Sequence, residues 1–340
     1  MKKLLNTLYV IQPTSYLYKD GQSVVVSVEQ KDLLRVPIIN LESIVAFGYA
    51  GCSPGLMKLC VDNGVSLSFF TPNGRYIARI QGEIRGNVTL RKKQYDVSKS
   101  EIESLDIAKT IVASKIYNQR GILMRYQRDY GRDEDVSEVI NGLLKMQKNS
   151  LKADTKDSLR GIEGMAASAY FSVFAKLITQ QKADFIFEGR NRRPARDEVN
   201  AMLSFSYTLL ANEITSALES VGLDPYVGVF HVVRPGRTSL SLDILEEFRS
   251  YLCDRFVLSL INRKQIQPND FLHQGAEGIV LTDKGRKKFI SAWQARKQEE
   301  IIHPYLEEKV KIGLLPFVQS KLLASHLRGN LDAYPPFLVK

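Results

Sequence analysis

The first eighty residues alternate between apolar and polar positions in short runs that predict β-strands. "TSYLYKDGQSVVVSV" forms two such runs around Asp20-Gly21, and "VSLSFFTPNGRYIARI" forms two more around Asn73-Gly74. Both pairs favour the positive φ that tight hairpin turns require. Between the hairpins, "SPGLMKLCVDNG" predicts a short helix that its Ser-Pro pair begins and Gly64 ends. This part of the chain therefore predicts a small sheet domain with one short helix.

From about residue 97 the spacing changes, and apolar residues recur every three or four positions, as in "KSEIESLDIAKTIVASKIYNQRGILMRY" and "DEVNAMLSFSYTLLANEITSALESVG". That period is typical of helices packed on a core. We therefore predict an α+β fold with a β-rich domain over residues 1–84, a linker over 85–96 and a mostly α-helical domain over 97–340. The last segment, "NLDAYPPFLVK", predicts a flexible tail that either docks on a partner or is a disordered terminus.

Composition narrows the possible partners and compartments. Lys and Arg outnumber Asp and Glu by 47 to 37, a formal charge of +10, which favours a polyanion partner because Lys and Arg bound to phosphates release counterions. The three cysteines show no CxxC spacing, so a thiolate zinc site or a disulfide framework is not expected, and a reduced cytoplasmic setting fits. The start "MKKLLNTLYVIQP" predicts a strand and not a signal peptide, because polar residues interrupt it. No run reaches the ~18 apolar residues of a membrane span.

The stretch "FHVVRPGRTSLSLDILEEFR" brings a histidine and three acids close together in the sequence. A short turn through "RPGR" lets the chain double back, so that His231 can face the first turns of a helix carrying Asp243, Glu246 and Glu247. The simpler interpretation is an amphipathic helix with a solvated acidic face and a satisfied histidine. Acidic residues in the first turn of a helix also interact favourably with the positive end of the helix dipole, so their presence does not require a catalytic role.

A further candidate is Glu163 in "RGIEGMAASAYF", where Gly161 and Gly164 leave room for another helix to approach. A carboxylate in a close-packed setting needs a proton, an arginine or a metal ion as partner. Arg160 is the simplest such partner. With His231 and an acid, Glu163 alternatively suits Mn²⁺ or Mg²⁺, because hard oxygens hold either ion and one imidazole favours manganese.

Two basic segments complete the candidate site residues. A loop before the helix that Asp197 can cap carries Arg190, Arg192, Arg193 and Arg196. On another predicted helix, a set of donors partly shares one face: Lys115, Asn118, Gln119, Arg125 and Arg128. Together they could line a phosphate-binding surface, although most charged loops are simply solvated.

Taken together and in this order, "RGIEGMAASAYF", "GRNRRPARDEVNAMLSFSYTLL" and "HVVRPGRTSLSLDILEEFR" resemble the Cas-one family, the metal-dependent endonuclease and integrase of CRISPR adaptation. The resemblance covers almost the whole chain and includes "KIYNQRGIL" and "GIVLTDKGRKKFI"; it is closest to subtype C of type I systems. It implies that Glu163, His231 and Glu246 hold the metal and carry catalysis. Asp243 is the alternative acid, or instead orients the site or touches DNA.

The resemblance also implies an activity and partners. Family members insert short DNA segments into a CRISPR array by attack of a 3′-hydroxyl on a phosphodiester, and a divalent ion, Mn²⁺ or Mg²⁺, assists that transfer. It implies double-stranded DNA as substrate, a homodimer formed through the N-terminal sheet domain, and two such dimers bridged by the Cas-two protein in a heterohexamer. Lys115 and the four arginines of the basic loop are the candidates for phosphate contacts. The alternatives are a DNA-binding scaffold without chemistry and a nuclease for branched repair intermediates.

Overall fold

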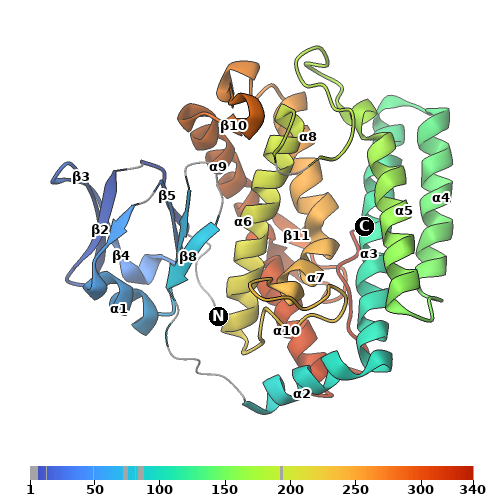
Figure 1. Ribbon diagram of the computed structural model, residues 1–340, viewed down its shortest axis with the longest axis horizontal. Helices are drawn as coiled ribbons and strands as arrows, with labels where there is room; N and C mark the ends of the chain where they lie inside the picture. Colours follow the sequence, from blue (N-terminus) through green and yellow to red (C-terminus); the bar gives the residue numbers. More distant parts are fainter. Residues whose placement is uncertain are drawn as a thin grey trace. The chain divides into compact units, whose positions relative to one another are not determined.

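The computed structural model describes residues 7–12, 14–48, 50–71, 76–80, 82, 88–191 and 194–339. The predicted turn at Asn73-Gly74 and the candidates Arg192 and Arg193 lie outside the described residues. The chain divides into two compact units (Figure 1). Unit 1 comprises residues 1–85 and 281–299, and unit 2 comprises residues 86–280 and 300–340.

Unit 1 contains two four-stranded sheets. The first has the order β1-β5-β7-β8, in which β1, β5 and β7 run parallel and β8 antiparallel to β7. The second has the order β4-β3-β2-β6. The bounds of these strands are β1 Thr7–Val10, β2 Ser15–Asp20, β3 Ser23–Val28, β4 Lys31–Pro37, β5 Ser43–Phe47, β6 Gly51–Cys52, β7 Ser66–Phe70 and β8 Tyr76–Ile80. The β2–β3 hairpin turns at Gly21, whose φ of 58° confirms the predicted positive-φ turn.

Helix α1 (Pro54–Asp62) confirms the predicted short helix, and the Ser53 hydroxyl caps it by accepting a hydrogen bond from Leu56 N at 3.2 Å. Its apolar side packs in one buried cluster with Ile44 and Ala46 of β5. On the other side of β5, the Phe47 ring lies 5.8 Å from the guanidinium of Arg286. That arginine belongs to α9 (Asp283–Gln298), so a helix far along the chain completes unit 1.

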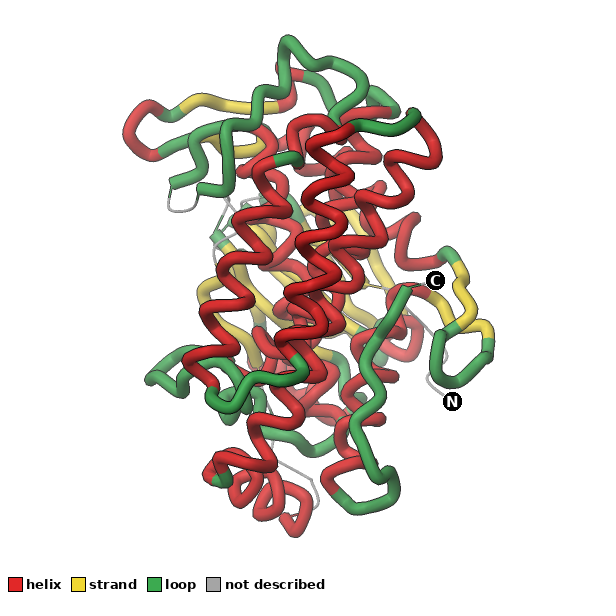
Figure 2. Tube along the Cα trace, turned by 90° about the vertical axis from the view of Figure 1, so that its right-hand side faces the viewer, coloured by secondary structure: helices red, strands yellow, loops and turns green. Residues whose placement is uncertain are grey.

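Unit 2 is mainly helical, as predicted, and Figure 2 shows its long helices side by side. Its helices are α2 Val88–Lys99, α3 Glu101–Tyr130, α4 Glu134–Ser150, α5 Lys156–Ser172, α6 Glu198–Ser220, α7 Ser239–Phe248, α8 Arg255–Asn262 and α10 Leu315–Leu327. Short elements join them: η2 Phe174–Leu177, the π-helix η3 Arg249–Asp254, β9 Phe271–His273, β10 Ile279–Leu281, β11 Glu300–Ile302 and β12 Lys309–Lys311. Asp197 caps α6 as predicted, accepting from Asn200 N at 2.7 Å.

The structure differs from the predicted domain limits in two places. The predicted linker, 85–96, overlaps helix α2, whose Gln94 side chain binds the backbone oxygens of Asp224 and Val227 at 2.8 and 2.9 Å. These contacts make α2 part of unit 2. The predicted helical domain, 97–340, also loses residues 281–299 to unit 1, because α9 packs on the sheet.

The prediction of a flexible C-terminal tail is wrong for the residues that the structure describes. Tyr334 and Phe337 are buried, and the Phe337 ring lies 5.1 Å from Phe248 and 5.8 Å from Tyr251. The tail backbone is also bonded, since Asn118 donates to Phe337 O at 2.8 Å. The tail therefore belongs to the core of unit 2. None of the described helices is long and apolar enough to cross a membrane.

Candidate active site

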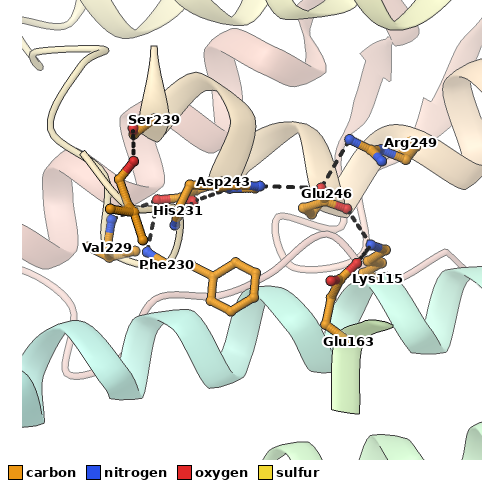
Figure 3. Close-up of polar contacts among 10 residues, drawn as sticks. Lys115, Glu163, Val229, Phe230, His231, Ser239, Asp243, Glu246 and Arg249 are labelled. Atoms are coloured by element: carbon orange, nitrogen blue, oxygen red, sulfur yellow. Dashed lines mark hydrogen bonds and ion pairs between the residues drawn. The ribbon is translucent and has the colours of Figure 1, made fainter. Parts of the chain in front are cut away.

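The turn before α7 and the helix itself bring His231 and Asp243 into contact. Asp243 is fully buried, and its carboxylate accepts backbone hydrogen bonds from Val229, Phe230 and His231 at 2.7, 3.1 and 2.8 Å. The same carboxylate lies 2.7 Å from Nδ1 of His231 (Figure 3). Gly228 permits this close approach, because a Cβ there would lie 2.6 Å from Oδ2 of Asp243. Asp243 thus fixes both the loop and the imidazole ring.

The contact with Asp243 decides which nitrogen of His231 is free. A carboxylate oxygen accepts a hydrogen bond from a ring N–H, so this contact favours the tautomer with the proton on Nδ1 and the lone pair on Nε2. Nε2 lies 4.0 Å from Oε1 of Glu246. The imidazole is therefore aimed at the next acid of α7.

Glu246 is a buried carboxylate surrounded by cations. Its Oε1 lies 3.0 Å from Nη2 of Arg249, and its Oε2 lies 2.7 Å from Nζ of Lys115 (Figure 3). Burial alone would raise the pKa of Glu246, but the charges of Arg249 and Lys115 outweigh it and lower the pKa to about 2. Glu246 is therefore ionised at neutral pH.

Glu163 joins the group through Lys115. The Lys115 ammonium, on α3, also bonds Oε1 of Glu163, on α5, and so bridges two carboxylates from different helices. The Lys115 side chain is 3% exposed and that of Glu163 is 24% exposed. Arg160, the simplest partner expected from the sequence, pairs with Asp157 instead.

The expected reason for the glycines beside Glu163 is not observed. A Cβ at Gly161 or Gly164 would meet nothing within 4 Å, so close approach of another helix does not require them. Both glycines are exposed, so at these two positions no side chain covers the surface of α5 next to Glu163.

The third acid of α7 faces away from the others. Glu247 is buried and accepts hydrogen bonds from Tyr334 Oη, Phe337 N and Gln319 Nε2 at 2.6, 2.8 and 3.0 Å. Burial raises its pKa to about 7. The alternative of a solvated acidic face is wrong, because all three acids of α7 are buried.

The basic candidates are dispersed. Arg190 donates to Asn200 Oδ1 at 2.5 Å and to Ser204 Oγ at 3.0 Å, while Arg196 is exposed. On α3, Asn118 and Gln119 are buried, and Arg125 and Arg128 both pair with Asp129. Lys115 and Arg190 thus both bind other side chains of unit 2. Their role as phosphate contacts stays a prediction.

Arg249 was missed by the sequence reasoning. Its position three residues after Glu246 on one helix is a sequence signal, because side chains at that spacing are neighbours. Apolar residues surround Arg249 in the sequence, so its pair with Glu246 was not predicted.

Among the described residues, no group of three His, Cys, Asp or Glu side chains is arranged to hold a metal ion. The predicted ligands are nevertheless linked through Glu246: the Lys115 ammonium bridges it to Glu163, and Nε2 of His231 lies 4.0 Å from its Oε1. Two carboxylates and one imidazole with a free nitrogen are a donor set that fits Mn²⁺ or Mg²⁺. The residue types therefore fit such an ion.

Comparisons with known proteins point to one family. The family model described as "CRISPR associated protein Cas1" matches residues 8–295. A relative from Rhodospirillum rubrum, named CRISPR-associated endonuclease Cas1 2, is 46% identical over 347 residues and covers 100% of both chains.

Two solved structures share the fold. The Cas1 protein TM1797 from Thermotoga maritima superposes with a TM-score of 0.83 at 24% identity, covering 98% of this chain and 100% of that one. A chain of a Cas6-RT-Cas1–Cas2 complex gives a TM-score of 0.82 at 22% identity, covering 98% of this chain and 36% of that one.

Proposed function

The chain belongs to the CRISPR-associated Cas1 family, and from this premise we propose that it is a metal-dependent DNA endonuclease and integrase of CRISPR adaptation. One observation carries the proposal: Glu163 and Glu246, which are far apart in the sequence, both contact the Lys115 ammonium, and Nε2 of His231 lies 4.0 Å from Oε1 of Glu246. The name of the Rhodospirillum rubrum relative, an endonuclease, supports the nuclease activity.

Glu163, His231 and Glu246 would hold a divalent cation, Mn²⁺ or Mg²⁺. When bound, such an ion polarises a phosphodiester and lowers the pKa of an attacking 3′-hydroxyl or water. Asp243 keeps the proton on Nδ1 of His231 and so leaves Nε2 free as a ligand. Arg249 and Lys115, which both contact Glu246, would offset the charge that the oxygens of the transferring phosphoryl group gain in the transition state. Integration and cleavage then differ only in the nucleophile.

The proposed substrate is double-stranded DNA, both the spacer precursor and the CRISPR repeat. We propose a homodimer formed through unit 1, where the edge strand β4 exposes Leu33 and Leu34, 57% and 45% exposed. A Cas2 protein bridging two dimers in a heterohexamer is the proposed partner, and the likeness to a chain of a Cas6-RT-Cas1–Cas2 complex supports it.

The test replaces Glu163 by Gln and measures joining of a 3′-hydroxyl duplex to a CRISPR repeat with added Mn²⁺. We expect joining to fall by about a hundredfold or more while DNA affinity is kept, because the carboxylate is lost and the basic surface is not. Asp157→Asn on the same helix is the control, since Asp157 is exposed and its ion pair among the described residues is with Arg160.

Two results would contradict the proposal. Unchanged joining by Glu163→Gln would remove Glu163 from the metal site. A wild-type protein that binds the repeat but neither joins nor cuts it would be a DNA-binding scaffold. A four-way junction assayed beside the array target separates integration from cleavage of branched repair intermediates.

A further inference from the structure

Tyr207 of α6 lies between two arginines in unit 2. The guanidinium carbon of Arg249 lies 4.7 Å from the centre of the Tyr207 ring, and that of Arg190 lies 5.3 Å from it. Both distances are within the ~6 Å at which a cation is attracted to an aromatic ring. The Tyr207 hydroxyl donates to Oδ1 of the fully buried Asp254 at 2.5 Å. The ring is therefore held at its hydroxyl and contacted by both cations.

The helix after α7 makes this arrangement possible. Arg249 and Asp254 are the first and last residues of the π-helix η3, five positions apart. In a π-helix the hydrogen bonds join residues i and i+5, so two residues at that spacing lie nearly above one another. In an α-helix they would point in clearly different directions. The π-helical turn thus lets one side chain, Tyr207, bind Asp254 and contact Arg249.

Arg249 also contacts Glu246, one of the proposed metal ligands, at 3.0 Å. A long arginine side chain has many rotamers, and placing its guanidinium beside one carboxylate costs conformational entropy. The Tyr207 ring reduces that freedom by covering the guanidinium, and Arg190, fixed to Asn200 and Ser204, covers the ring in turn.

We propose that Tyr207 is a positioning residue of this active site, which acts by holding the guanidinium of Arg249 against Glu246. The inference rests on the proposed function for its kinetic consequence, but the contact itself is a property of the fold. Among the described residues, the hydrogen bond and the cation contacts of Tyr207 are with Asp254, Arg249 and Arg190 and not with a proposed metal ligand. Its effect on DNA joining passes through Arg249.

The test compares Tyr207→Met, which removes the aromatic ring, with Tyr207→Phe, which keeps it and loses only the hydroxyl. At saturating DNA and Mn²⁺, we expect the single-turnover joining rate of Tyr207→Met to fall by about tenfold with DNA affinity changed by less than about twofold. Tyr207→Phe should restore most of the rate. In an Arg249→Gln background, Tyr207→Met should cause no further loss, because its route of action is already removed.

Tyr334→Leu is the matched control. Tyr334 is also a buried tyrosine whose hydroxyl binds a buried carboxylate, that of Glu247, but the phenol does not cover Arg249. Its variant should lose stability and keep the joining rate. If Tyr207→Met does not fold, Tyr207→Gln, which keeps a polar group for Asp254, takes its place.

A crystal structure of the variant separates this inference from the proposed function. We expect the contact between Arg249 Nη2 and Glu246 Oε1, 3.0 Å in the wild type, to be lost. A retained contact, a wild-type joining rate, or an equal loss of rate in Tyr334→Leu would overturn the role of Tyr207. A wild-type protein that neither joins nor cuts DNA would instead contradict the proposed function, and the crystal structure would still decide about Tyr207.

Discussion

At the scale of single residues, the three acids of α7 show that neighbours in the surrounding fold decide what a carboxylate does. Asp243 accepts backbone and imidazole hydrogen bonds, Glu246 faces two cations, and Glu247 binds the C-terminal tail. The pKa values follow these surroundings: about 2 for Glu246 beside Arg249 and Lys115, and about 7 for Glu247, whose burial dominates. Glu246 combines charge and burial with a position opposite Nε2 of His231, the nitrogen that Asp243 does not contact.

Asp254 gives a test of these electrostatics away from the proposed ligands. Burial raises its pKa from 3.8 to about 6, although Tyr207 and Arg249 oppose the shift. At pH values between 3.8 and about 6, the Asp254 carboxyl is ionised in the unfolded chain and protonated in the folded chain. The wild type therefore loses stability as the pH rises through this range. Asn has no such proton and keeps an oxygen for the Tyr207 hydroxyl.

We therefore expect the free energy of unfolding of Asp254→Asn, relative to the wild type, to rise by about 2 kcal/mol between pH 4 and pH 7. Urea unfolding at a series of pH values measures it. Parallel curves for the two proteins across this range would mean that the pKa of Asp254 is the same in the folded and unfolded chains.

The sequence alone predicted part of this site. The short turn before α7 indicated that His231 could meet the acids, and the small residues around Glu163 made its carboxylate a candidate. The lysine between the carboxylates was not predicted in that place, because periodicity orients a helix toward a core without saying which ion pairs form inside it. The role of Glu247 was equally hidden, since it depends on a backbone group of the C-terminal tail. Orientation of the site by Asp243 was one of the stated alternatives.

At the scale of elements, the hairpin at Gly21 and helix α1 were predictable because their turn and capping residues act locally. The π-helix η3 and the place of α9 were not. A turn with i→i+5 hydrogen bonds is not marked by particular residue types, so the sequence does not predict it. The segment of α9 carries a helical pattern that does not say which sheet it covers, and its packing on β5 is a contact between residues far apart in the sequence.

The C-terminal tail provides a prediction at this scale. Phe337 is fully buried against Phe248 and Tyr251, so Phe337→Ala should lower the free energy of unfolding by about 4 kcal/mol through lost burial and the cavity left behind. Tyr305→Ala is the control, because its side chain is 48% exposed and its loss should change stability by less than about 0.5 kcal/mol. Chemical denaturation measures both, and equal small effects would mean that the tail is not docked in solution.

At the scale of the whole molecule, the structure indicates which residues account for the net charge of +10. The cations of the site are balanced, because Lys115 and Arg249 face Glu163 and Glu246. Such pairs cancel in the net charge and contribute nothing to the excess. The excess positive charge therefore comes from other residues, among them exposed ones such as Arg196, which are free to approach phosphates.

This distribution predicts a steep dependence of DNA affinity on salt. If six or more phosphates are contacted, the affinity should fall by about a thousandfold between about 50 and 200 mM NaCl, because each neutralised phosphate releases a condensed counterion. Arg196→Ser should lower the slope of log affinity against log salt by about one, and it should weaken binding to all sequences alike. Lys58→Ser on α1 is the control, because Lys58 already pairs with Asp62 at 3.1 Å. A slope that Arg196→Ser leaves unchanged would remove Arg196 from the DNA interface, since a counterion is released only where a phosphate is contacted.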